Sequence, residues 1–152
     1  MTIREVSHAG PRLDEVAVAS VERELGVRLP DDYRSFLFQF NGGQPTPDAF
    51  RFKGGSDGSL VNIFFGINHP DQQHDLVRVW RDNRRVLSAD LLPIGYDAGG
   101  SLILLGIGGK RRGRVFFEFR DQAGEDDDPM SEEFIGEIGD SFAAFAATFH
   151  EA

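Results

Sequence analysis

The chain has 152 residues, of which 40% are hydrophobic, and this length and composition suit one folded domain with a sizeable core. Its 25 acidic and 16 basic residues give a formal net charge of −9, which disfavours nucleic acid as a ligand and favours a basic protein partner. Because it has no cysteine and no apolar run near the ~18 residues needed to cross a bilayer, disulfides, thiolate metal sites and membrane insertion are excluded, and we expect a cytoplasmic protein.

The first predicted elements are an arm and a helix. Residues 1–10 are typical of a loose or strand-like arm, and Pro11 then introduces an amphipathic helix that ends at Gly26. The apolar positions predicted to share the buried face of this helix are Leu13, Val16, Ala17, Val21 and Leu25.

The stretch Leu29–Gly43 predicts a second, short and buried helix. Pro30 suits its first turn, where the missing N–H costs nothing, and Asn41-Gly42-Gly43 can adopt the left-handed conformation that ends a helix. The apolar residues that recur at i, i+3, i+4 and i+7 are Tyr33, Phe36, Leu37 and Phe40.

The rest of the chain alternates between strand and helix patterns. Strands are predicted at residues 50–52, 60–67 and 91–94, the second of them buried on both faces, and residues 101–120 are predicted to form a β-hairpin. The apolar run SLILLGIGG from Ser101 indicates either a deeply buried strand or a hydrophobic edge that faces a partner. A third helix is predicted from Leu76 to Asn83.

A last helix is predicted after residue 140, with Asp140 or Ser141 as its cap and a stripe of phenylalanines. This order of elements predicts an α+β fold, in which a mostly antiparallel β-sheet carries packed helices. We expect a single domain over residues 1–152, with a polar, acidic loop at 121–130.

Three blocks of sequence form a recognisable pattern: the helix ending in Glu24-Leu25-Gly26 with LPDDYRSFLFQFNGG (residues 29–43), LPIGYDAGG (92–100) and DSFAAF (140–145). Together these blocks resemble the SMI1/KNR4 family, also called the SUKH superfamily. The resemblance implies a β-sheet with helices packed on it. The positions that match the family pattern are Leu29, Pro30, Tyr33, Phe36, Asn41, Gly42, Gly43, Pro93, Gly95, Gly100 and Phe142.

The densest charge in the chain marks the candidate binding residues. The acidic run consists of Glu125, Asp126, Asp127 and Asp128, and Asp57 and Asp97 are further acidic residues that we expect to be exposed. We interpret these six residues as a surface that binds lysine and arginine side chains of a partner. An alternative is that the run forms internal ion pairs with a basic cluster, which comprises Lys110, Arg111, Arg112 and Arg114.

The patterns of known catalytic and metal sites are not matched. His69 and His74 are five residues apart, which matches no metal signature, and the glycines of residues 106–110 fit a hairpin turn better than a phosphate loop. Glu118 lies in an apolar strand, and we expect it on a solvated face of the sheet. No catalytic residue, cofactor or metal is therefore predicted.

The family resemblance implies two functions, and the sequence suggests a third. Many bacterial members are immunity proteins that neutralise a polymorphic toxin, often a nuclease, and fungal relatives are scaffold-like regulators. The leading hypothesis is a non-enzymatic immunity protein that binds a basic toxin domain, and the alternative is a regulatory or scaffold module without a toxin partner. The third possibility is a small-ligand binder or enzyme that uses a pocket beneath the glycine-rich turns around Tyr96-Asp97 and Gly99-Gly100.

Overall fold

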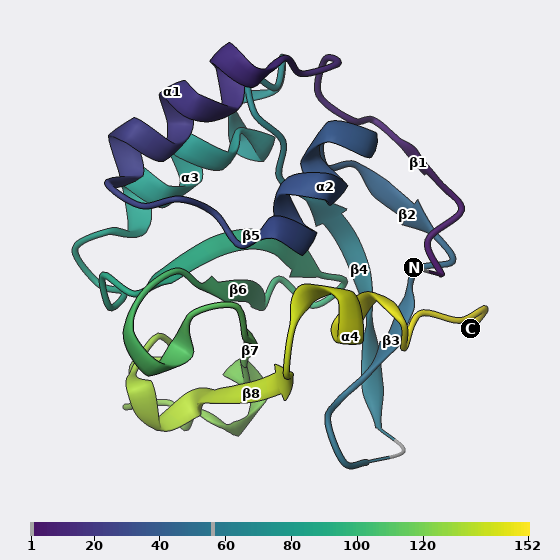
Figure 1. The fold of residues 1–152 in the computed structure, drawn as a ribbon. Helices are drawn as coiled ribbons and strands as arrows, with labels where there is room; N and C mark the ends of the chain where they lie inside the picture. Colours follow the sequence, from purple (N-terminus) through teal and green to yellow (C-terminus); the bar gives the residue numbers. More distant parts are fainter. Residues whose placement is uncertain (1, 56) are drawn as a thin grey trace.

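The computed structural model describes residues 2–55 and 57–152. Its strands form a two-stranded antiparallel sheet and a six-stranded antiparallel sheet in the order β3-β4-β5-β6-β7-β8, so the predicted α+β class is confirmed (Figure 1). The strands are β1 (Glu5–Ser7), β2 (Gln44–Thr46), β3 (Ala49–Arg51), β4 (Gly58–Phe64), β5 (Leu91–Asp97), β6 (Leu102–Gly106), β7 (Val115–Glu118) and β8 (Ile135–Gly139).

The helices of the described residues pack on the curled six-stranded sheet. The α-helices are α1 (Glu15–Leu25), α2 (Asp31–Gln39), α3 (Leu76–Asn83) and α4 (Phe142–Ala146). Short 3-10 turns lie at η1 (Gln72–His74), η2 (Gly109–Arg111), η3 (Arg120–Gln122) and η4 (Glu132–Phe134). An ion pair between Glu24 and Arg81 links the end of α1 to α3, and α4 lies near β3 and β8 (Figure 1).

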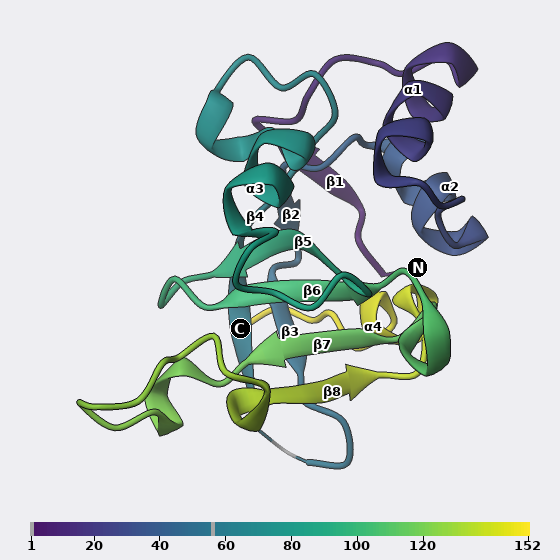
Figure 2. The same ribbon diagram turned by 90° about the vertical axis from the view of Figure 1, so that its left-hand side faces the viewer.

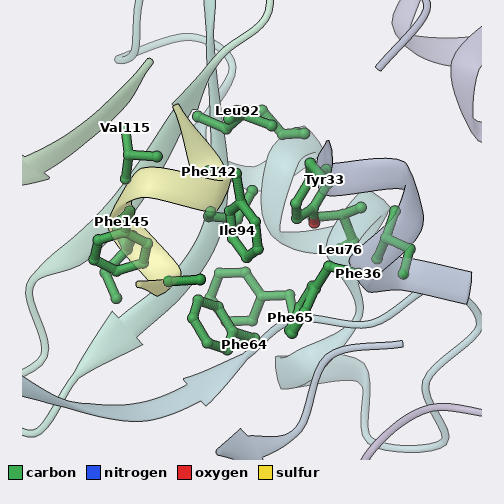
Figure 3. Packing of buried hydrophobic residues seen from close by; sticks show 14 of the residues in the cluster. Tyr33, Phe36, Phe64, Phe65, Leu76, Leu92, Ile94, Val115, Phe142 and Phe145 are labelled. Atoms are coloured by element: carbon green, nitrogen blue, oxygen red, sulfur yellow. The ribbon is translucent and has the colours of Figure 1, made fainter. Parts of the chain in front are cut away.

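Aromatic side chains form the centre of the core, where α2, α4 and the sheet meet (Figure 3). The ring centroid of Phe142 lies 4.9 Å from that of Phe36 and 5.3 Å from that of Tyr33. Phe64 of β4 joins them with its ring centroid 5.1 Å from that of Phe36. Each of these rings removes a large apolar area from water, and edge-to-face pairs add further stabilisation. The stripes predicted for α2 and α4 therefore pack against each other.

The predicted face of α1 is wrong at one position. Val16 is 73% exposed, whereas Val18, which was not predicted, is 0% exposed. Each residue advances about 100° around a helix, and the buried stripe that passes through Ala17, Val18 and Val21 leaves Val16 on the outer side. Valines 16 and 18 are chemically identical, so only the packing partner decides which one is buried.

The predicted strands differ from the structure mainly in their ends. Strand β5 continues to Asp97, because Tyr96 and Asp97 still pair with neighbouring strands. In β4, Leu60 and residue 62 are exposed, so the prediction of burial on both faces holds only for part of the strand. The β6–β7 hairpin is confirmed, and residues 103–105 of β6 are 0% exposed, which makes SLILLGIGG a buried central strand.

Asn41 is the polar residue that joins the start of α1, the end of α2 and the chain after β4. Its backbone has a positive φ of 54°, as predicted for the end of this helix. Its Nδ2 donates to the carbonyl oxygens of Pro11 (2.8 Å) and Ile67 (2.9 Å), and its Oδ1 accepts the N–H of Ile67 (2.7 Å). The N–H of Gly10 donates to the Asn41 carbonyl at 3.0 Å. Although only 2% of Asn41 is exposed, the oxygen and the nitrogen of its side-chain amide therefore both have hydrogen-bond partners.

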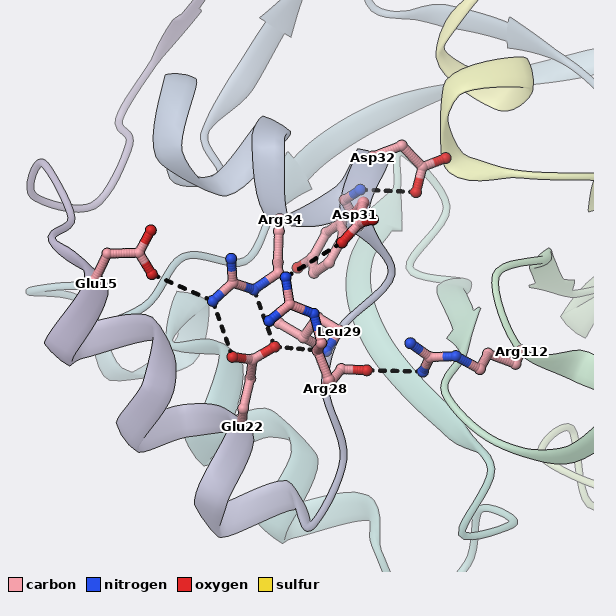
Figure 4. Close-up of polar contacts among 9 residues, drawn as sticks. Glu15, Glu22, Arg28, Leu29, Asp31, Asp32, Arg34 and Arg112 are labelled. Carbon is pink, nitrogen blue, oxygen red and sulfur yellow. Dashed lines mark hydrogen bonds and ion pairs between the residues drawn. The ribbon is translucent and has the colours of Figure 1, made fainter.

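A second polar contact fixes the corner between α1 and α2 (Figure 4). The Glu22 carboxylate accepts the N–H of Leu29 at 2.7 Å and both Nε (3.0 Å) and Nη2 (3.1 Å) of Arg34. The side chains of Glu22 and Arg34 are only 11% and 13% exposed. Burial raises the pKa of Glu22, but the hydrogen bonds from Arg34 and Leu29 outweigh it, and the pKa lies below its usual value of 4.5.

We predict that Asn41→Ala lowers the free energy of unfolding by about 3 kcal/mol, because it leaves buried backbone groups of Ile67 without partners and places alanine at a positive φ. Urea unfolding followed by circular dichroism measures this change. Gln39→Ala, at an exposed position of the same helix, is the control and should change stability by less than about 0.5 kcal/mol. Equal stability of the two variants would contradict the role of Asn41.

The lowered pKa of Glu22 predicts a pH dependence of stability. A carboxylate with a depressed pKa in the folded state stabilises the fold above pH 4.5, and this contribution is lost as the pH falls below that value. We expect Glu22→Gln to cost about 2 kcal/mol at pH 7 and to flatten the dependence below pH 4.5. Urea unfolding at several pH values measures both effects, and a variant with the wild-type pH profile would contradict them.

Candidate protein-binding surface

The sheet topology places all of the predicted acidic residues at one end of the sheet. Consecutive strands run antiparallel, so the β3–β4, β5–β6 and β7–β8 connections share an end, and the β6–β7 connection lies at the other. Figure 2 shows the β5–β6 turn and the β7–β8 connection on the same side of the molecule, away from the β6–β7 connection. Asp57 belongs to the first of these three connections, Asp97 precedes the second, and the acidic run at 125–128 lies in the third.

The acidic run is exposed and has no counter-charge in the part of the chain that the structure describes. All four of its side chains are solvent-exposed, and no ion pair joins them to a lysine or arginine among residues 2–55 and 57–152. Asp127 accepts the N–H of Gly124 (2.8 Å) and Asp128 accepts that of Met130 (3.0 Å), which shapes the loop. Met130 packs on the outer face of the sheet beside Phe116, so the run stands on an anchored segment.

The basic cluster pairs elsewhere, and the alternative of ion pairs with the acidic run is wrong for the described residues. Arg111 contacts Asp90 and Glu132, and Arg114 contacts Glu137 and Asp140. Arg112 donates instead to backbone carbonyls of residues 28 and 107. The two clusters sit on connections at opposite ends of β7, which leaves the charge of the acidic run uncompensated.

Asp57 and Asp97 have different environments. Asp57 is exposed in the β3–β4 connection, as predicted. Asp97 is only 7% exposed, so the expectation of an exposed side chain was wrong. Its Oδ1 accepts the N–H groups of Gly99 (3.0 Å) and Ser101 (2.8 Å), and its Oδ2 accepts the hydroxyl of Ser59 (2.7 Å). The glycine turn that follows Asp97 folds around the carboxylate, which explains the burial.

A hollow of about 340 Å³ opens beside Asp97, beneath the turn at residues 98–100. We call it the sheet-end hollow. The residues that line it are Phe52, Gly58, Ser59, Asp97, Gly99, Ser101, Phe117, Phe119, Arg120 and Asp121. Three strand connections therefore meet at one concave surface with aromatic and charged walls. The hollow lies at the position of the small-ligand site considered from the sequence.

Glu118 was expected on a solvated face, and this was wrong. It is 0% exposed because residues 119–134 fold back over the outer face of β7. Its Oε1 accepts Nε (3.2 Å) and Nη2 (3.1 Å) of Arg120, whereas its Oε2 has no hydrogen-bond partner among the described residues. Burial raises the pKa of Glu118, against the opposing effect of the Arg120 charge. Strand alternation correctly predicted the face of β7 on which Glu118 lies, but it did not predict that residues 119–134 cover this face.

The histidines and acidic side chains of the described residues were also compared with the requirements of a metal site. His69 and His74 do approach each other, with ring centroids 5.5 Å apart, but His69 Nδ1 accepts the N–H of Asp71 at 3.0 Å. Among residues 2–55 and 57–152, no group of three or more His, Cys, Asp and Glu side chains could hold a metal ion. Within the same ranges, no helix is both long and apolar enough to pass through a membrane.

A sequence model of the SMI1 / KNR4 family (SUKH-1) matches residues 12–148, which is most of the chain. The chain belongs to this family. A search of curated proteins found no match. The SMI1/KNR4 match begins before α1 and extends past α4, so it includes the whole six-stranded sheet and leaves out β1.

The residues that match the SMI1/KNR4 pattern mainly build the fold, and of these eleven residues Gly100 lies in the β5–β6 turn at the acidic end. Tyr33, Phe36 and Phe142 form the aromatic core, and Asn41 holds three segments together. None of the eleven pattern residues lines the sheet-end hollow or belongs to the acidic run. The residues that sequence reasoning missed are the hollow's aromatic walls and Arg120, because their meeting depends on strand pairing that no local pattern reveals.

We predict that Glu118→Gln raises the free energy of unfolding at pH 7 by about 1 kcal/mol, because it removes a charge whose second oxygen has no partner. A carboxyl group with a raised pKa in the folded state costs stability as the pH rises above 4.5, its usual value. The variant should lose that cost. Urea unfolding from pH 4 to pH 8 measures the difference, and the exposed Glu133→Gln is the control. Destabilisation of the variant at pH 7 would show that the Arg120 pair outweighs burial.

Proposed function

We propose that this SMI1/KNR4 protein is a non-enzymatic immunity protein that acts in the cytoplasm and neutralises a polymorphic toxin with a basic domain, such as a nuclease. The observation that carries this proposal is the acidic run at 125–128 on a chain of net charge −9, which is exposed and has no lysine or arginine counter-ion within residues 2–55 and 57–152. Family membership supports the proposal, since immunity proteins are one of the two functional groups that the resemblance implies.

The physical argument concerns the surface of the toxin. A nuclease site is basic because it holds phosphate groups, so an acidic inhibitor approaches it faster than a neutral one and fits its potential. Exposed carboxylates at the rim of an interface mainly raise the association rate, whereas a buried pair changes dissociation. The acidic run therefore steers the encounter, and the concave sheet end beside it provides the contact surface.

The scaffold supports this role because the loop can bind without refolding the domain. Met130 and Ile135 anchor the returning chain on Leu104 and Phe116, so the acidic run is presented from a fixed base. A surface that is already formed loses less conformational entropy on binding than a disordered segment does. The acidic end can thus bind a protein partner while the core remains unchanged.

We predict that changing Asp126, Asp127 and Asp128 together to lysine leaves the fold intact and weakens toxin binding at least tenfold, since it reverses the charge that meets a basic surface. The control variant changes Glu5, Asp82 and Glu151 to lysine, which alters the net charge equally at exposed positions on other elements. Circular dichroism checks folding, and surface plasmon resonance measures the association rate. Equal weakening by both variants would indicate an effect of net charge alone.

Affinity capture from the source organism, with this protein as bait, identifies the partner. The captured proteins that remain after a moderate-salt wash are identified by mass spectrometry. Recovery of a toxin domain supports the immunity function. Recovery of cell-wall or signalling proteins in its place favours the regulatory module and contradicts the proposal.

A further inference from the structure

The sheet-end hollow contains a buried carboxylate without a cation of its own. Asp97 receives three hydrogen bonds, from two backbone N–H groups and the Ser59 hydroxyl, and all three hold it in place as an acceptor. No lysine or arginine of the described chain forms an ion pair with it. Buried carboxylates are usually paired with a cation or a metal. Asp97 thus resembles one half of an ion pair.

The one basic side chain in the hollow is already engaged. Arg120 is bound through Nε and Nη2 to Glu118, so their charges balance. Asp121 lies at the rim, exposed and without an ion pair among the described residues. With Arg120 balanced by Glu118, Asp97 and Asp121 leave the hollow with an excess of negative charge.

The walls of the hollow are aromatic. Phe52 and Phe119 are partly exposed, their ring centroids lie 5.0 Å apart, and Phe117 completes the group at 5.2 Å from Phe52. Aromatic faces beside a carboxylate suit a planar cation, because a guanidinium group stacks on rings while one of its N–H groups donates to the carboxylate. Oδ1 of Asp97 already accepts two N–H groups, whereas Oδ2 accepts only the Ser59 hydroxyl and keeps one acceptor position for such a donor. An ammonium group is not planar and cannot form the stacking contact.

We infer that the sheet-end hollow receives an arginine side chain of the partner, with its guanidinium on Asp97 and against the rings of Phe52 and Phe119. This inference rests on the proposed function, because a basic toxin domain supplies the arginine. The acidic run beside the hollow attracts the basic surface, and the hollow then holds one side chain of it. The hollow therefore supplies specificity, which the exposed run does not.

The test uses the full chain and a small probe, acetyl-Gly-Arg-Gly-amide, followed by amide chemical shifts in nuclear magnetic resonance spectra. We expect saturable shifts at Ser59, Gly99, Ser101 and Phe119, with a dissociation constant on the order of millimolar. The same peptide with citrulline, which is neutral and similar in shape, should give no such shifts. Absence of saturable shifts with the arginine peptide, or equal shifts with both peptides, would overturn the inference.

A matched pair of variants sharpens the test. Asp97→Asn keeps the geometry, because its amide oxygen can accept both N–H groups and its NH₂ can donate to Ser59, and it should weaken peptide binding about tenfold. Glu133→Gln, an exposed change in the β7–β8 connection outside the hollow, should leave binding unchanged. Phe52→Leu removes one ring face and provides a second measurement should Asp97→Asn fail to fold. Unchanged binding in Phe52→Leu and in folded Asp97→Asn would overturn the inference.

The captured toxin separates this inference from the proposed function. If Asp97→Asn keeps full toxin affinity while the triple lysine variant loses it, the hollow has no such role and the immunity function stands. If the peptide binds in the hollow but no toxin is captured, the arginine site is supported and the proposed partner is not.

Discussion

The structure depends on one buried amide side chain. Asn41 forms its hydrogen bonds with Pro11 and Ile67 only when the start of α1, the end of α2 and the chain after β4 are in register. A buried amide without hydrogen-bond partners destabilises the fold by more free energy than its hydrogen bonds contribute when they form. Misplacement of any of these three segments is therefore unfavourable. The aromatic core supplies most of the stabilisation, but rings can pack in several ways, and Asn41 selects one arrangement.

Much of the fold could be predicted because its signals are local. The stripe of Tyr33, Phe36 and Leu37 and that of Phe142 and Phe145 are fixed by helical periodicity, and the structure buries all five. The buried face of α1 could not be predicted correctly at every position, because valines on both sides of the helix are equally hydrophobic. The C-terminal end of β5 was missed for a related reason, since pairing with neighbouring strands, and not composition, keeps a tyrosine and an aspartate in the strand.

In the candidate site, too, the features that depend on local sequence were predictable and those that depend on tertiary contacts were not. The exposure of the acidic run was predictable, because four adjacent carboxylates have no way to be buried together. Burial of Asp97 and Glu118 was not predictable, since it depends on a turn that wraps one carboxylate and on a loop that returns over the other. Alternation along a strand assigns a side chain to a face, and only tertiary structure shows whether that face is covered.

The separation of charge between the two ends of β7 gives the molecule a permanent dipole. The β7–β8 connection carries carboxylates without counter-ions, and the β6–β7 connection carries Lys110 and Arg112, for which no carboxylate partner is found among residues 2–55 and 57–152 (Figure 2). A dipolar molecule is turned by the field of a charged partner before the two surfaces touch. In the proposed complex with a basic toxin domain, this alignment shortens the rotational search and keeps the basic end facing solvent. Salt shortens the range of that alignment to about 10 Å at 0.1 M ionic strength.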